Sequence, residues 1–273
     1  MTQRLSNEST KMAFLNNSKI INLPELSYIE DEVSAVNLSN ESLHFANTLF
    51  NASPDYDLTW SFETDQFDIR LYTRAIMDSK INLTYSIIEI DRPAEVVFEY
   101  LRHNFLTPLF QHNKVFDSTK MMSASIGDKL LLTHATSYEG FAWAYREWCQ
   151  LHTTDSRNMQ IISTSCLSKD YNNASGGFFQ YFLPVGTIPA REFYSMRVTK
   201  GSSEHNCKVL GLRWADMGGA YLPAFYMTKY LCDMWTRSLL ALRVTFEKMP
   251  STLPTITNPP EEGEEENQLD LRL

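Results

Sequence analysis

The residues best suited to binding chemistry lie in one short stretch, Tyr145–His152, which reads YREWCQLH. Trp148, Gln150 and His152 occur at every second position, and side chains at this spacing point to the same face of a β-strand. If that face lines a cavity, the Gln150 amide and the His152 imidazole can hydrogen-bond the polar group of a bound molecule. The alternative is a histidine that is satisfied within the fold or exposed to water. For Arg146 we expect a structural salt bridge at the sheet edge rather than a ligand contact.

Motifs that would indicate catalysis or metal binding are missing from the sequence. It contains no G-x-G-x-x-G or P-loop, no H-E-x-x-H and no G-x-S-x-G nucleophile elbow. None of the four cysteines forms a C-x-x-C pair or lies at zinc-finger spacing, so we expect free thiols in a reducing compartment. We therefore expect no enzyme, no metal and no cofactor. The remaining catalytic hypothesis is a histidine and a cysteine that meet on adjacent strands, as His134 with Cys149 or His152 with Cys166.

Aromatic and methionine side chains are frequent in the last predicted strand and in the long segment after it. They are Trp214, Tyr226, Met227, Tyr230, Met234 and Trp235. Such side chains form an adaptable apolar surface that suits an acyl chain or a ring system. The alternative is an ordinary hydrophobic core, and the two overlap in a fold whose last helix closes both core and cavity. We predict that these residues line a ligand cavity together with Trp148, Gln150 and His152.

A long connection between two predicted strands, residues 168–190, has a polar first half and an apolar second half. The apolar half contains Phe178, Phe179, Phe182 and Leu183. An exposed apolar loop of this size is unusual unless it covers something. We therefore predict a lid over the cavity, which hinges near its glycines and touches a membrane when it opens. The alternative is an additional buried strand.

These residues require a scaffold, and hydrophobic periodicity predicts its elements. Helices are predicted over Ile29–Leu49, over Ala94–Leu101 and within residues 104–113. Strands rich in β-branched and aromatic residues are predicted over residues 58–63, 67–74, 81–90, 115–124, 129–136, 144–153, 159–167, 190–199 and 207–217. The last element is a long helix over Tyr221–Lys248 with one broad apolar face. This order predicts an α+β fold, in which a curved antiparallel β-sheet wraps around the long C-terminal helix and leaves a cavity between them.

Charge and composition separate a nearly neutral domain from its tails. We expect a disordered N-terminal arm over residues 1–30, a binding domain over 31–249 and a disordered acidic tail over 250–273. Six acidic residues and one arginine follow Pro250, so the tail contributes −5 to the net charge of −9. No basic stripe is present for nucleic acid. The sequence has no apolar run long enough for a membrane span and no apolar N-terminal signal segment, so we expect a cytoplasmic protein.

Three stretches match the motifs of a known family. Ile88–Leu101, IEIDRPAEVVFEYL, is similar to a strand-to-helix junction with P-x-x-V-F-x-x-L, and Tyr145–Trp148 is similar to a strand start P-R-D-F. Arg213–Arg243 is similar to an ending D-x-x-G-x-x-P followed by a long helix that closes in L-R. The residues that match this ending are Asp216, Gly219, Pro223, Leu242 and Arg243. Together these stretches resemble the START family, the StAR-related lipid-transfer domain, over residues 40–249.

The resemblance implies a helix-grip fold with an internal hydrophobic tunnel that holds one lipid, either a phospholipid or a sterol-like molecule. It implies lipid transfer by a monomer that contacts membranes transiently, and it implies no catalytic residue. Several sterol-binding members carry a buried acid–arginine pair. Here His152 falls near the arginine's place, and Leu132–His134, near the acid's place, contain no carboxylate, so a sterol anchor gains no support. The alternatives are a helix-grip enzyme of the cyclase or hydrolase type and a START-like interaction protein with a filled cavity.

Overall fold

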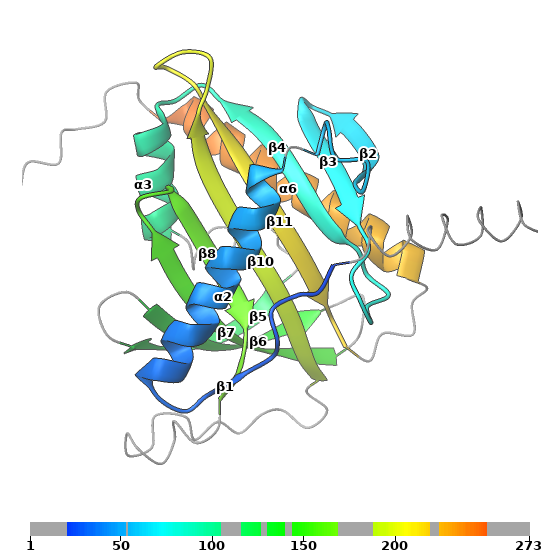
Figure 1. Cartoon of the computed structure of the whole chain (residues 1–273), viewed down its shortest axis with the longest axis vertical. Helices are drawn as coiled ribbons and strands as arrows, with labels where there is room; N and C mark the ends of the chain where they lie inside the picture. Colours follow the sequence, from blue (N-terminus) through cyan, green and yellow to red (C-terminus); the bar gives the residue numbers. More distant parts are fainter. Residues whose placement is uncertain are drawn as a thin grey trace, which may run out of the picture.

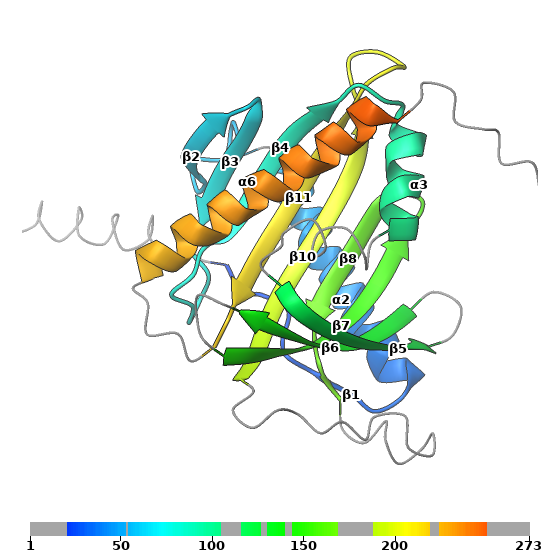
Figure 2. The same cartoon turned by 180° about the vertical axis from the view of Figure 1, so that it is seen from behind.

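The structure, a computed structural model, describes residues 21–52, 54–104, 116–126, 130–139, 144–168, 188–218 and 224–249. The helices in this part of the chain are α2 (Glu32–Asn51), α3 (Ala94–Asn104) and α6 (Ala224–Lys248). The strands are β1 (Tyr28–Ile29), β2 (Ser61–Gln66), β3 (Ile69–Arg74), β4 (Leu83–Ile90), β5 (Phe116–Ile126), β6 (Leu130–Glu139), β7 (Ala144–Asp155), β8 (Gln160–Ser165), β9 (Leu167–Ser168), β10 (Ile188–Lys200) and β11 (Cys207–Asp216). Figure 1 shows α2 in front of a large sheet, and Figure 2 shows α6 against the opposite face.

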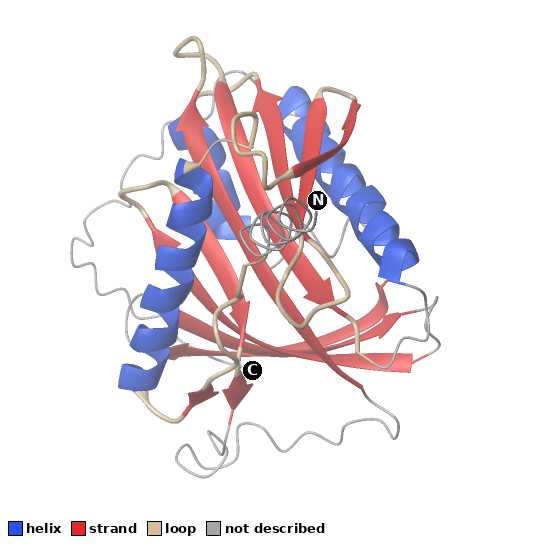
Figure 3. Ribbon diagram, turned by 45° about the vertical axis from the view of Figure 1, so that its right-hand side comes forward, coloured by secondary structure: helices blue, strands red, loops and turns tan. Residues whose placement is uncertain are grey.

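Nine strands form this sheet in the order β2-β3-β4-β11-β10-β8-β7-β6-β5, and neighbours in this order run antiparallel. Beyond the end of β8, β10 pairs directly with β7 in parallel, with Ile188 opposite Arg146. Strands β5, β6 and β7 cross one end of the sheet at a steep angle to β4, β11 and β10 (Figures 2 and 3). The sheet therefore curls, with an inner face toward α6 and an outer face toward α2. This is the α+β helix-grip architecture that the sequence predicts.

Helix α6 lies on the inner face of β4 and β11, and one glycine permits its close approach. A Cβ atom at Gly211 of β11 would lie 2.4 Å from Ser86 Oγ and 2.8 Å from Trp235 Cζ2. Because that Cβ is absent, the Trp235 ring is fully buried against the strands, and its Nε1 donates to Ser86 Oγ at 3.0 Å. At the C-terminal end of α6, the Arg92 side chain donates to two main-chain carbonyl oxygens at 2.8 and 2.6 Å, where a cation is favoured.

Helix α2 packs on the outer face of the sheet through aromatic contacts. Phe45 meets Phe193 of β10 edge-to-face, with ring centroids 5.0 Å apart. Phe50 meets Tyr85 of β4 in the same way at 5.8 Å. Edge-to-face pairs add to the free energy that the rings already gain by burial, so these contacts hold α2 firmly to the sheet.

Residues 21–30 form a strap across the outer face that is held at both ends (Figure 1). Ile21 bridges to Ile76 after β3, and β1 pairs with β9. Between these points, the Leu23 side chain packs against the core. Residues 21–30, which the sequence places in a disordered arm, are therefore part of the folded structure. The composition of residues 21–30 does not predict their ordered structure, because it depends on main-chain hydrogen bonds to segments that are distant in sequence.

Each predicted strand has a counterpart in the sheet, while some predicted ends move. Helix α2 begins at Glu32, later than predicted, because Asp31 caps it by accepting from the Ser34 N–H at 2.8 Å. The short helix predicted within residues 104–113 falls almost wholly outside the described residues, as do the acidic tail and the first twenty residues. Within the described ranges, no helix is both long and apolar enough to span a membrane.

Candidate functional site

Buried polar side chains line the inner face of the sheet beside α6. They form two rows that cross neighbouring strands in register. The first row, from β7 to β4, consists of His152, Ser163, Tyr194, Arg213 and Thr84. The second row, from β6 to β10, consists of Thr133, Gln150, Ser165 and Glu192. We call these two rows together the polar belt.

Alternation along the strands turns the polar belt inward and its neighbours outward. On β7, Leu151 lies between two belt residues and belongs to the outer apolar cluster with Ile29. The belt side instead meets α6, because the Arg213 guanidinium lies over the Trp235 ring at 5.3 Å and the Tyr194 ring contacts it edge-to-face at 5.4 Å. The belt therefore lies on the side of the sheet that the helix covers.

A buried ion pair forms one part of the belt. Glu192 Oε1 accepts from Arg213 Nε at 2.9 Å, and Glu192 Oε2 accepts from Gln150 Nε2 at 2.9 Å. The two charged side chains are only 3% and 8% exposed. A buried ion pair is tolerated when both partners are hydrogen-bonded, and here both carboxylate oxygens are. The pair cancels its own charge, so it leaves a polar but neutral surface.

The neighbouring part of the belt carries uncharged groups. His152 Nε2 and Thr133 Oγ1 are hydrogen-bonded at 2.6 Å. Burial lowers the pKa of His152 to about 3, because an imidazolium would lose its hydration there, so the ring is neutral at physiological pH. Ser163 Oγ is buried and has no hydrogen-bond partner among the described residues. Leaving a buried hydroxyl unsatisfied costs about 1–3 kcal/mol, which a ligand that hydrogen-bonds this oxygen would recover.

Solved structures share this architecture, although no family model and no curated protein matches the sequence. Human StAR-related lipid transfer protein 5 matches with a TM-score of 0.61 at 12% identity, covering 80% of this chain and 98% of that one. The chain has a START-like fold. Human STARD10 matches with a TM-score of 0.57 at 12% identity, covering 74% of this chain and 78% of that one. A STAR-related lipid transfer protein fragment from Xanthomonas axonopodis matches with a TM-score of 0.52 at 16% identity, covering 69% and 99%.

Within the START-like fold, most of the residues predicted to line a cavity lie on the inner side. Trp148, Gln150 and His152 are buried on one face of β7, as their spacing predicts. Met234 and Trp235 are buried on α6, Tyr230 is half-buried, and Met227, also buried, lies near the start of α6 where it lines the hollow beneath the strap. Contact of any of these side chains with a ligand remains a prediction.

Three predicted positions are corrected by the structure. Trp214 points to the outer face, because it follows Arg213 on β11, and its Nε1 donates to Ser79 Oγ at 3.0 Å. Tyr226 is 58% exposed near the start of α6 and lines no interior surface. Arg146 does not lie at the sheet edge: β7 is an internal strand, the side chain is 1% exposed, and it donates to a main-chain oxygen at 3.4 Å.

An acid–arginine pair is present, but not where the resemblance places it. At the expected place, the neutral His152–Thr133 hydrogen bond joins β7 to β6. The ion pair Glu192–Arg213 instead joins β10 to β11. Sequence reasoning missed Glu192, Arg213 and Ser163, although the short connection between the strands predicted over residues 190–199 and 207–217 would have set the β10–β11 register that brings the first two together.

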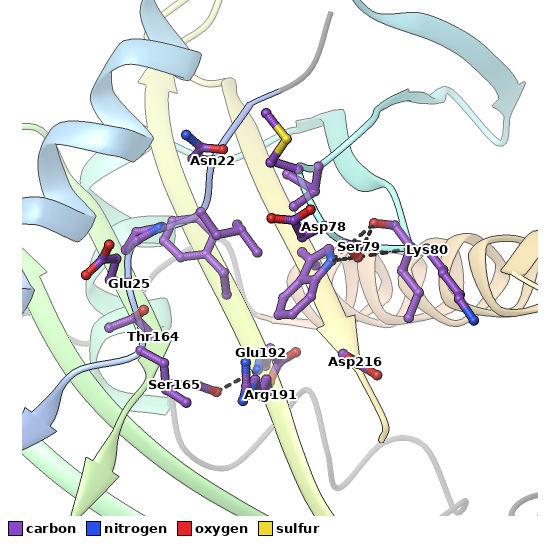
Figure 4. Close-up of a pocket in the computed structure, with 18 of the residues that line it drawn as sticks. Asn22, Glu25, Asp78, Ser79, Lys80, Thr164, Ser165, Arg191, Glu192 and Asp216 are labelled. Atoms are coloured by element: carbon purple, nitrogen blue, oxygen red, sulfur yellow. Dashed lines mark hydrogen bonds between the residues drawn. The ribbon is translucent and has the colours of Figure 1, made fainter. Parts of the chain in front are cut away.

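A hollow of about 800 Å³ lies on the outer face beneath the strap (Figure 4). The strap, residues 76–81 and the ends of β8, β10 and β11 line it, with Trp214 and Met227 among its residues. Arg191 and Asp216, opposite each other on β10 and β11, bring both signs of charge to its lower rim (Figure 4). This mixture of charges indicates no particular ligand, so we place the candidate site at the polar belt.

The predicted lid residues Phe178, Phe179, Phe182 and Leu183 lie outside the described residues, so the lid stays a prediction. Of the two histidine–cysteine pairs that could supply a base and a nucleophile, the structure leaves one untested and contradicts the other. His134 is opposite Cys149 in the β6–β7 register, but the His134 side chain is not among those described. His152 faces the inner side, whereas Cys166 packs in the outer cluster, so these two side chains do not form a base–nucleophile pair.

Proposed function

We propose that the protein binds a single lipid molecule between the inner face of the sheet and α6, and transfers it between membranes. The observation that carries this proposal is the polar belt, a set of buried polar groups on the concave side of a START-like fold. A sheet face that served only as a core would have little use for so many polar side chains, since each must be hydrogen-bonded to avoid a penalty. Their concentration beside an apolar helix face suits an amphipathic ligand.

The two parts of a lipid would meet two kinds of side chain. Its apolar part would contact Trp148, Met234 and Trp235, and burial of apolar surface contributes about 25 cal/mol per Å². Its polar group would meet the uncharged end of the belt, where Ser163 offers a hydroxyl beside His152. Apolar burial would supply the affinity, and these few polar groups would supply the orientation and specificity.

We propose a lipid carrier rather than an enzyme, acting as a cytoplasmic monomer that contacts membranes transiently. His152 and Cys166 lie on opposite faces of the sheet, so they do not supply a base and a nucleophile to one site. The lipid-transfer names of the similar structures, human StAR-related lipid transfer protein 5 among them, favour the same conclusion. The competing hypothesis is an interaction protein whose interior is filled by its own side chains, and it predicts no bound lipid.

Native mass spectrometry of the full chain tests the proposal. The protein would be incubated with vesicles made from a total lipid extract, separated from them and sprayed intact. We expect a monomer that carries the mass of one lipid. A protein that remains free of lipid with extracts from several sources would contradict lipid binding and favour the filled interior.

A matched pair of variants locates the bound lipid. Ser163→Leu replaces a hydroxyl of the polar belt with an apolar branch, and Ser156→Leu makes the same change at an exposed turn. We expect the lipid-bound fraction to fall only for Ser163→Leu, with both variants first checked for folding by circular dichroism. If both variants retain lipid as the wild type does, the lipid binds elsewhere.

A further inference from the structure

Two cysteine side chains meet on the outer face, in the apolar cluster beneath α2. Cys149 lies on β7, and Cys166 follows directly after β8. Their Sγ atoms are 3.6 Å apart, and the Cys166 N–H donates to the Cys149 carbonyl oxygen at 3.0 Å. The two residues continue the antiparallel register in which Gln150 is opposite Ser165, so they are direct cross-strand partners.

The backbone at this pair suits a disulfide bond. Directly opposite residues in a hydrogen-bonded antiparallel pair have Cα atoms about 5.5 Å apart. Disulfides in proteins join Cα atoms roughly 4.4–6.8 Å apart with a sulfur–sulfur bond of about 2.05 Å. The Sγ atoms of Cys149 and Cys166 therefore need to approach by about 1.5 Å, a distance that side-chain rotation can supply without moving the strands.

The two thiols differ in their exposure to solvent, and this difference decides which of them a dissolved oxidant reaches first. Cys149 is half-buried, whereas Cys166 is 3% exposed. The hydrogen bond with Cys149 and burial raise the pKa of the Cys166 thiol, so Cys166 stays protonated at neutral pH. The other two cysteines, Cys207 and Cys232, are buried in the cluster on the inner side of the sheet, away from this pair. A small oxidant from solvent would thus meet Cys149 first.

We propose that Cys149 and Cys166 form a reversible oxidation site for hydrogen peroxide. The Cys149 thiol gives up its proton, and the thiolate sulfur attacks one peroxide oxygen. The O–O bond breaks, and the hydroxide that leaves takes up that proton, so that a sulfenic acid and one water result. The Cys166 sulfur then attacks the sulfenic sulfur and loses its proton, while the S–O bond breaks and a second water leaves. In total, two thiols and one peroxide give one disulfide and two waters. A dithiol reductant reverses the oxidation by exchange through a mixed disulfide.

The bond would tighten a junction that the fold otherwise holds by main-chain hydrogen bonds. Cys166 immediately precedes β9, and β9 pairs with β1 at the end of the strap. A disulfide would tie β7 to the point where the chain leaves β8 for β9. It would also close the β7–β8 hairpin in the unfolded chain, which lowers the entropy of that state. The site is independent of lipid binding, because the thiols lie on the opposite side of the sheet from the polar belt.

Peptide mapping after mild oxidation tests the proposal, and the sequence suits it. Trypsin places the four cysteines on four peptides, residues 147–157, 158–169, 201–208 and 230–237. The reduced full chain would be treated with graded hydrogen peroxide, alkylated to block free thiols and digested without reductant. We expect 147–157 linked to 158–169, with 201–208 and 230–237 alkylated. Dithiothreitol should restore all four alkylated peptides, and oxidation should raise the Tm by about 3 °C or more.

Other outcomes would overturn the proposal. One is Cys149 oxidised to sulfinic acid while Cys166 is still alkylated, and another is no linked peptide at peroxide levels that already modify Cys207 or Cys232. A linked peptide that dithiothreitol does not release would overturn reversibility. In Cys166→Ser, the Cys149 sulfenic acid should persist and be trapped by dimedone, whereas trapping no stronger than in the wild type would argue against Cys166 as the resolving thiol.

Discussion

Both faces of the nine-stranded sheet are buried, yet the same strands carry apolar side chains on the outer face and many polar side chains on the inner face. On the outer face, Ile162 and Phe193 pack in apolar contacts beneath α2. One residue further along each strand, Ser163 and Tyr194 face inward as part of the polar belt. The difference cannot come from exposure to water, since residues on both faces are buried.

The contrast separates what holds the fold together from what would select a ligand. Apolar rings on the outer face contribute stability without needing hydrogen-bond partners. Polar groups on the inner face contribute little net stability, because each must replace its lost hydrogen bonds to water. We therefore expect outer-face substitutions to change stability and inner-face substitutions to change ligand binding, except where an inner substitution leaves a charge unpaired.

Phe193→Ala should give the largest loss of stability, because it removes a ring that packs on the outer face. The ring is 1% exposed and packs against Phe45, so its removal leaves a cavity and should cost about 4 kcal/mol of unfolding free energy. Urea unfolding measures the loss, and Phe62→Ala, at a 59% exposed ring on β2, should lose less than about 1 kcal/mol. Lipid bound per folded chain should not change. A folded Phe193→Ala that has lost its lipid would contradict the division between the faces.

Glu192→Gln tests the exception on the inner face. It leaves the Arg213 guanidinium buried without its counter-charge and should cost about 3 kcal/mol in urea unfolding. The matched control is Glu89→Gln, whose partner Lys208 is exposed, and it should cost less than about 1 kcal/mol. The double variant Glu192→Leu/Arg213→Met should recover most of the loss, because neither charge remains. If the double variant recovers no stability, the attraction between Glu192 and Arg213 exceeds the free energy that is needed to remove both charges from water.

The sequence predicts the elements and one face of β7 well, because both follow from local periodicity. Trp148, Gln150 and His152 share a face since their spacing is two residues, whatever surrounds them. The pair Glu192–Arg213 escaped prediction because its partners are 21 residues apart and meet only through the β10–β11 register. Trp214 was placed on the wrong side because its residue type was weighed without its parity on that strand. The strap escaped because its partners, near Ile76 and at β9, are distant in sequence.

The pH dependence of stability sharpens the comparison at His152. Its pKa is about 3 in the folded protein and about 6.5 in an unfolded chain, so between these values only the unfolded state takes up the proton. This group therefore contributes its full stability above pH 6.5, and the contribution falls as the pH drops, by about 2 kcal/mol at pH 5. Urea unfolding at pH 7.5 and pH 5 should show a smaller loss for His152→Gln than for the wild type.

A second histidine serves as the control for that experiment. His103 lies on α3 with its side chain 62% exposed, so His103→Gln makes the same substitution outside the polar belt and shows what the change of residue type alone does. Equal losses between pH 7.5 and pH 5 in the wild type and in His152→Gln would show that the folded protein accommodates a charged His152. The conclusion that His152 is held neutral in the polar belt would then be wrong.

Ser163→Ala has the smallest expected effect on stability and separates the two faces most sharply. The hydroxyl is buried without a described partner, so its removal relieves an unsatisfied group and should leave the unfolding free energy unchanged or raise it by up to about 1 kcal/mol. Under the proposed function, the same change removes one hydrogen bond to the lipid and should weaken binding about fivefold. Ser156→Ala, at the exposed turn, should change neither quantity. Phe193→Ala and Ser163→Ala would then show opposite patterns at neighbouring positions of β10 and β8, one losing stability and the other losing lipid. If Ser163→Ala destabilises the fold and binds lipid as the wild type does, the hydroxyl serves the protein's own core, and the inner face is a structural interior like the outer one.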